Sequence, residues 1–219
     1  FGQGTFLEAL CNSAGRLSLV QLSILWMLMM SAMMAPSFQS HIQTHMDIMS
    51  RSGRIWPSVQ LIFGYLLIWL ALALVAAMVQ KVLVNFGLVD FSGRSISLSL
   101  NSILCFAAAF YQFSSWKKIS LKKCSSPMHY FFRHWIDGSI GSLKMGIHLG
   151  FWCASCCWAL MLLAFIGGAM NIVWMAVITA IVVFEKCFPT TQIASRLIGQ
   201  TFLCLGILMF ILCIFLESS

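Results

Sequence analysis

The stretch Ser58–Val84, SVQLIFGYLLIWLALALVAAMVQKVLV, decides the fold class because it is apolar almost from end to end. Its one charged residue is Lys81. A helix needs about 20 consecutive apolar residues to cross the hydrocarbon core of a bilayer. The apolar run is continuous and does not alternate with polar residues, so it predicts a membrane-spanning helix and not a strand of a closed barrel.

The whole chain has the same character. Of its 219 residues 60% are hydrophobic and only 9% are charged, against about 25% charged residues in soluble domains. We therefore predict an all-α protein, a polytopic transmembrane helix bundle that forms a single domain over residues 1–219. About six spans are predicted, at approximately Leu17–Phe38, Ser58–Val84, Ile96–Trp116, Lys144–Gly167, Asn171–Cys187 and Ile198–Leu216. The sequence GGAMN between the fourth and fifth spans predicts a tight helical hairpin, in which Asn171 is expected to cap the fifth span.

The basic residues predict how the helices are oriented. Ten Lys and Arg residues lie in the loops after the first, third and fifth spans, and three lie on the opposite side. Basic loops stay in the cytoplasm, so we expect a multi-pass protein of the bacterial inner membrane, with a basic cytoplasmic loop at 117–143 and both ends exterior. In that loop, MHYFFRHWI predicts a short helix at headgroup depth. Membrane lipids are the expected partners, and this use of the charges argues against a nucleic-acid partner.

A cluster of cysteines interrupts the fourth span. The sequence GFWCASCCWALM, residues 150–161, holds three cysteines in five residues. On a helix with 100° per residue, Cys153, Cys156 and Cys157 share an arc of about 100°, and Met161 extends that arc by one turn. The pattern suits a soft metal ion, but close packing of small side chains between membrane helices explains it about as well. A reactive redox pair is less favoured, because the motif lies in mid-helix among aromatic residues.

The first span carries a second group of sulfur atoms. In WMLMMSAMMAP the side chains of Met30, Met33 and Met34 face one way. Thioethers and thiolates both favour Cu(I), so one site shared with the cysteines is conceivable if the two helices touch. The alternative is that these methionines are adaptable fillers of the core.

Several further side chains are weaker candidates for metal ligands. His148 lies about 7 Å along the helix from Cys153 and belongs to another layer. His41 and His45 are four residues apart but lack a third ligand, so ordinary surface histidines are the favoured alternative. Glu185 precedes Lys186, where snorkelling or a local ion pair is expected. The weaker candidates are His148, Met170, Met175, Glu185, His41 and His45.

Five motifs resemble one known family. They are WMLMMSAMMAP, GYLLIW, AAAFYQFSSWKKISLKKCSSP, GSLKMGIHLGFWCASCCWALM and GGAMNIVWMAVITAIVVFEK, and together they cover most of Trp26–Lys186. In order and spacing they are similar to the bacterial family of predicted metal-binding integral membrane proteins, a domain of unknown function. The resemblance implies metal binding by the same Cys and Met residues. Similar proteins often carry one further N-terminal span, which the resemblance implies before Phe1.

These observations favour one function and leave two alternatives. The leading interpretation is a membrane protein that binds a soft metal ion, with copper as Cu(I) favoured, for delivery, storage or export. The first alternative is an accessory subunit of a larger membrane enzyme complex, in which the cysteines are contact residues. The second is a membrane thiol oxidoreductase. The sequence has no P-loop, HExxH or GxSxG motif, so an enzyme is less favoured than a binding protein.

Overall fold

The fold of the chain is helical. The computed structural model describes residues 18–50, 56–90, 93–125, 138–169, 171–187 and 191–217. In these residues the regular structure is helical, apart from an isolated bridge between Val89 and Ser95. The helices are α2 (Leu19–Ser50), α3 (Trp56–Asn85), α4 (Leu98–Phe113), α5 (Ser115–Ser125), α7 (Ser139–Leu162), α8 (Ala164–Gly167), α9 (Ile172–Cys187) and α10 (Thr191–Glu217).

Within the described residues, four helical stretches are long and apolar enough to cross a membrane. They are Leu19–Ile48, Trp56–Asn85, Ile140–Gly167 and Ala194–Leu216. The prediction of about six spans is not confirmed, because the third and fifth predicted spans form α4 and α9, of 16 residues each. At 1.5 Å per residue such a helix is about 24 Å long, which is shorter than a hydrocarbon core of about 30 Å.

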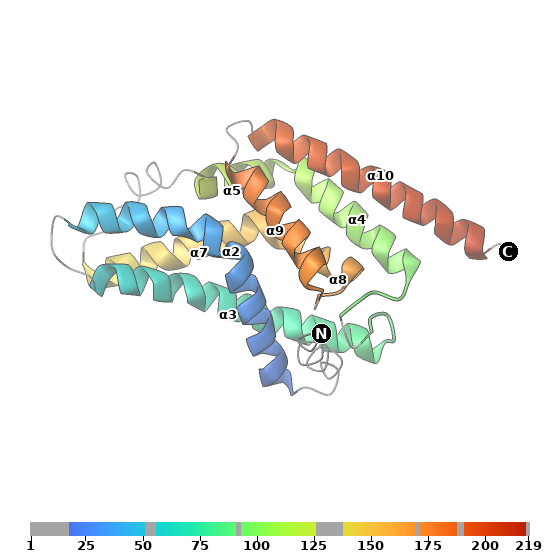
Figure 1. Cartoon of the computed structure of the whole chain (residues 1–219), viewed down its shortest axis with the longest axis horizontal. Coiled ribbons are helices and arrows are strands. Elements are labelled where there is room, and N and C mark those ends of the chain that lie inside the picture. Colours follow the sequence, from blue (N-terminus) through green and yellow to red (C-terminus); the bar gives the residue numbers. More distant parts are fainter. Residues whose placement is uncertain are drawn as a thin grey trace, which may run out of the picture.

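The helices form two packed groups that α9 and α7 connect (Figure 1). In the first group α3 lies along α7, α2 crosses α3, and the short helix α5 packs on α7. In the second group α4 and α10 run side by side. Because α5 folds back onto α7, a segment predicted as part of the basic cytoplasmic loop becomes part of the core. The predicted interfacial helix MHYFFRHWI lies outside the described residues.

Helix α2 continues well beyond the predicted end of the first span. Pro36 lies inside the helix, and Figure 1 shows two arms of α2 at an angle. Proline removes one backbone hydrogen bond and its ring pushes against the preceding turn, which bends a helix without always ending it. The second arm brings His41 and His45 into the core, where both are buried. The interpretation of these two histidines as surface residues is therefore wrong.

The predicted turn after the cysteine helix is present. Asn171 Oδ1 accepts hydrogen bonds from the backbone N–H groups of Val173 at 3.0 Å and Trp174 at 3.2 Å. This arrangement satisfies two of the N–H groups that the first turn of α9 leaves without a helical partner. The predicted cap at Asn171 is confirmed, and it fixes where α9 starts relative to α7.

Two glycines allow α3 and α7 to approach closely. A Cβ atom on Gly146 would lie 2.1 Å from the Leu61 carbonyl oxygen, and one on Gly64 would lie 2.4 Å from the Leu143 carbonyl oxygen. We expect Gly146→Ala to lower the free energy of unfolding by about 1–3 kcal/mol, because the two backbones must separate. Thermal unfolding in detergent measures the effect. Gly206→Ala is the matched control with a smaller expected loss, since its nearest contact is at 3.2 Å. A Gly146→Ala protein as stable as the wild type would contradict this packing.

Candidate metal centre

Three cysteine side chains from two helices meet in the core. The sulfur atoms of Cys124, Cys153 and Cys156 all lie within 4.8 Å of one another, and all three residues are buried. We call these residues the thiol cluster. Cys153 and Cys156 are three residues apart on α7 and so share one face, whereas Cys124 comes from the last turn of α5. Thiolate sulfur is the ligand type that selects soft ions such as Cu(I).

Cys124 is the member of the cluster that the sequence analysis missed. It lies in the segment predicted as a cytoplasmic loop. A signal was present, however, because the buried positions of α5 are Lys117, Ser120, Leu121 and Cys124. Their spacing is that of one face of a helix. The lysines between them obscured this pattern.

Cys157 borders the thiol cluster, but its sulfur is not among the three that lie within 4.8 Å of one another. Its Sγ donates to the Cys153 carbonyl oxygen at 2.9 Å and lies 3.9 Å from Met34 Sδ. Helices α2 and α7 therefore bring sulfur atoms of both sequence motifs together. Of the methionines predicted on α2, Met34 is the one with a sulfur contact to these cysteines among the contacts of the described residues.

Lys186 points into the sulfur-rich region. Its Nζ donates to Cys153 Sγ at 3.2 Å and lies 3.6 Å from Met34 Sδ. The side chain is buried, so the expected snorkelling or local pairing with Glu185 does not occur. The reason is that α9 ends beside the thiol cluster. There the Lys186 ammonium can donate hydrogen bonds to sulfur atoms. Tyr65 also contacts Cys153, with its hydroxyl oxygen 3.3 Å from Cys153 Sγ.

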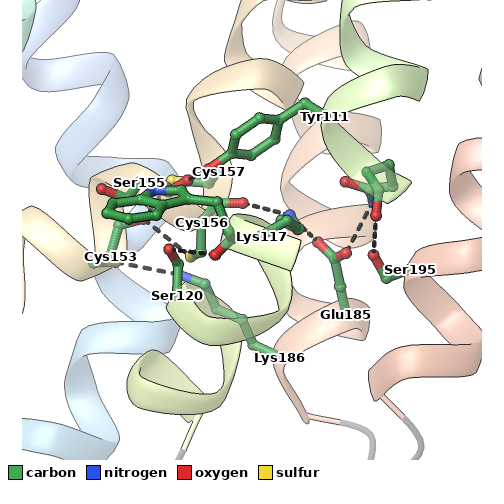
Figure 2. A network of polar contacts seen from close by, with 12 residues as sticks. Tyr111, Lys117, Ser120, Cys153, Ser155, Cys156, Cys157, Glu185, Lys186 and Ser195 are labelled. Atoms are coloured by element: carbon green, nitrogen blue, oxygen red, sulfur yellow. Dashed lines mark hydrogen bonds and ion pairs between the residues drawn. The ribbon is translucent and has the colours of Figure 1, made fainter. Parts of the chain in front are cut away.

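A buried ion pair lies on the other side of the cluster. Glu185 Oε2 is 2.8 Å from Lys117 Nζ, and the two side chains are 2% and 1% exposed. Glu185 Oε1 accepts from Gln112 Nε2 at 2.9 Å. Lys117 also donates to the carbonyl oxygen of Cys156, and Figure 2 shows this chain of contacts running from Glu185 to the cysteines. Both carboxylate oxygens of Glu185 therefore already have a partner. We interpret Glu185 as a structural residue beside the cluster and not as a metal ligand.

The other predicted methionine ligands have different surroundings. Met30 and Met161 are buried in the same hydrophobic core as the cysteines. Met33 and Met175 line a cavity between α2 and α9. Met170 lies outside the described residues.

The three histidines predicted as weaker candidates for metal ligands differ in their surroundings. His41 Nδ1 lies 3.1 Å from the Ser37 carbonyl oxygen, and its ring is near enough to Cys153 and Lys186 to interact with them electrostatically. His45 Nδ1 instead lies 3.0 Å from Ser58 Oγ. His148 Nε2 accepts from Trp152 Nε1 at 2.9 Å, in keeping with its expected place in another layer.

Comparison with known proteins identifies the family. Residues 23–209 match the model of a family described as PpoB2, copper chaperone. The chain belongs to the PpoB2 copper chaperone family. The match includes the thiol cluster and Lys186, and together with the cluster it indicates that the protein handles copper or a related metal. The match supports the metal-related family that the sequence motifs suggested, although the matching family model has a different name. Searches of curated proteins and of solved structures gave no significant match to this PpoB2 family member.

Proposed function

We propose that the protein is a membrane-embedded copper chaperone that holds one Cu(I) ion as cargo at Cys124, Cys153 and Cys156. The observation that carries the proposal is the meeting of three buried cysteine sulfurs within 4.8 Å. Cu(I) prefers thiolate and thioether ligands, and the surrounding core excludes water and the anions that would compete for the ion. A copper chaperone family match supports copper as the cargo.

The number of sulfur atoms favours Cu(I) over zinc. Structural zinc sites in proteins are almost always tetrahedral with four ligands. A fourth cysteine, Cys157, is near, but its sulfur is not among the three that lie within 4.8 Å of one another. Three sulfur ligands complete a trigonal Cu(I) site. Such a site also leaves room for an incoming ligand of an acceptor protein, which is what delivery of the ion requires.

The membrane location rests on two features. Four helical stretches are long and apolar enough to cross a bilayer, and α3 and α10 carry many exposed large apolar side chains, such as Phe63 and Phe210. Lys117 and Lys186 are buried, so they do not count as loop charges. Without them, eight basic residues remain on the predicted cytoplasmic side against three on the other. This balance still supports an inner-membrane protein with cytoplasmic basic loops.

A competition titration with Cu(I) under reducing, oxygen-free conditions tests the proposal. The wild-type protein in detergent should retain one tightly bound equivalent against a strong chelator, and the triple variant Cys124→Ser, Cys153→Ser, Cys156→Ser should not. Cys105→Ser is the matched control, because Cys105 is a buried free cysteine on α4. Equal stoichiometry and affinity in the wild type and the triple variant would refute the proposal.

Lys186 is expected to strengthen Cu(I) binding through its charge. One Cu(I) with three thiolates has a net charge of −2, and a buried anion is costly without a counter-charge. The Lys186 ammonium, 3.2 Å from Cys153 Sγ, reduces that charge. We expect Lys186→Leu to lower Cu(I) affinity by about 10–100-fold, as for other outer partners of metal ligands. Lys186→Arg should keep most of the affinity. The same competition titration measures both variants, and unchanged or tighter binding in Lys186→Leu would argue against this role.

A further inference from the structure

Three methionines line a cavity between α2 and α9 that is open to the surface of the helix bundle. The cavity has a volume of about 440 Å³ and is lined almost entirely by apolar side chains. Met29 and Met33 contribute from α2, and Met175 contributes from the first turn of α9. None of these three residues belongs to the thiol cluster.

The local sequence explains why three thioethers share this space. Met29 and Met33 are four residues apart and so lie on the same face of α2. The Asn171 cap starts α9 just before Met175, which places that side chain opposite α2. Ala32 and Ala176 also line the cavity, and their small side chains leave the space that the longer methionines can reach.

The cavity offers few ligand atoms other than sulfur. Its hydroxyl-bearing residue is Thr179, and that hydroxyl donates to the Met175 carbonyl oxygen at 2.7 Å. Thioethers carry no charge and bind Cu(I) in preference to harder ions. A Cu(I) ion held by thioethers keeps a net charge of +1, so these sulfurs should bind it more weakly than thiolates do.

We propose that Met29, Met33 and Met175 form a second, weaker Cu(I) site next to the thiol cluster. The two sites use neighbouring positions of α2: Met33 lines the cavity, and the next residue, Met34, has its Sδ 3.9 Å from Cys157 Sγ and 3.6 Å from Lys186 Nζ. The second site would hold an ion on its way to or from the cysteines, with no change in the oxidation state of copper. The identity of the ion rests on the proposed function.

The experiment uses the full chain in detergent, labelled with selenomethionine, so that thioether ligands differ from cysteine sulfur in the X-ray absorption spectrum. In the triple Cys→Ser variant of Cys124, Cys153 and Cys156, about one equivalent of Cu(I) should remain against a weak chelator. Its copper-edge spectrum should show selenium neighbours. Adding Met29→Leu, Met33→Leu and Met175→Leu should remove both signals, while adding Met78→Leu should not. Leucine keeps the volume of the side chain, and Met78 is an exposed methionine of α3.

The outcomes separate the two proposals. If the triple Cys→Ser variant holds no weakly bound Cu(I), or if its spectrum shows no selenium neighbours, the second site is refuted while the thiol site stands. An acyl chain is the competing occupant of the cavity. A lipid that co-purifies with the protein and is lost in the Met→Leu variant, with copper binding unchanged, would also refute the second site. If tight binding survives the Cys→Ser changes, it is the proposed function that fails.

Discussion

Replacing Cys124 by serine is expected to lower the affinity for Cu(I) by at least about 100-fold, although this residue lies outside the CASCC motif. Its sulfur is one of only three within 4.8 Å of one another in the described cluster. Loss of a direct ligand should cost at least as much as loss of an outer partner of a ligand, which lowers metal affinity by about 10–100-fold. Competition titration against a strong chelator measures the change.

Cys157→Ser is the informative control for this prediction. Cys157 is adjacent in sequence to Cys156 and equally buried, but its sulfur is not among the three that lie within 4.8 Å of one another. Its replacement should change the affinity much less than Cys124→Ser does. If Cys157→Ser abolished tight binding and Cys124→Ser did not, the ligand set would be the local motif and not the cluster between α5 and α7.

Glu185→Gln is expected to cause the largest loss of stability. The change would leave the Lys117 ammonium buried without its anion, and removing one partner of a buried ion pair costs about 3–5 kcal/mol. Lys117 Nζ lies 2.8 Å from Glu185 Oε2, and both side chains are at most 2% exposed, so bulk water does not solvate the ammonium in place of the carboxylate. Reversible unfolding in mixed detergent, or the midpoint of thermal unfolding, measures the effect.

A double variant distinguishes the pair from other roles of Glu185. Lys117→Met combined with Glu185→Leu removes both charges, so it should recover most of the stability lost in Glu185→Gln. Lys117 also donates to the Cys156 carbonyl oxygen. The Cu(I) affinity of the double variant shows whether this second contact matters for the thiol cluster. Additive losses in the double variant would show that the two side chains act independently, contrary to the structure.

The sequence predicted the features that depend on local pattern. The long apolar run at Ser58–Val84 indicated a helix that the structure has as α3, because hydropathy and length alone specify such a helix. Helical periodicity placed Cys153 and Cys156 on one face, as they are on α7. Polar side chains signalled the cap at Asn171 because capping involves only neighbouring residues.

The features that depend on contacts between distant segments were not predictable in the same way. Lys117 and Lys186 count as loop charges in a hydropathy profile, yet each is buried against a partner from another helix. Cys124 reaches the cluster only because the chain turns at Ser114, whose backbone is extended, and α5 then packs against α7. The first span was predicted to end at about Phe38, whereas α2 continues to Ser50 and brings His41 toward the cysteines. The position of the site therefore follows from packing that no single segment specifies.

The most direct test of the central claim is the copper-edge X-ray absorption spectrum of selenomethionine-labelled protein loaded with one equivalent of Cu(I). We expect three sulfur neighbours per copper, with no selenium, nitrogen or oxygen atom bound to the ion. In the Cys124→Ser protein one sulfur neighbour should be lost. A first shell of nitrogen or oxygen atoms, or a spectrum that is the same in the wild type and in Cys124→Ser, would contradict the claim that Cys124, Cys153 and Cys156 hold the ion.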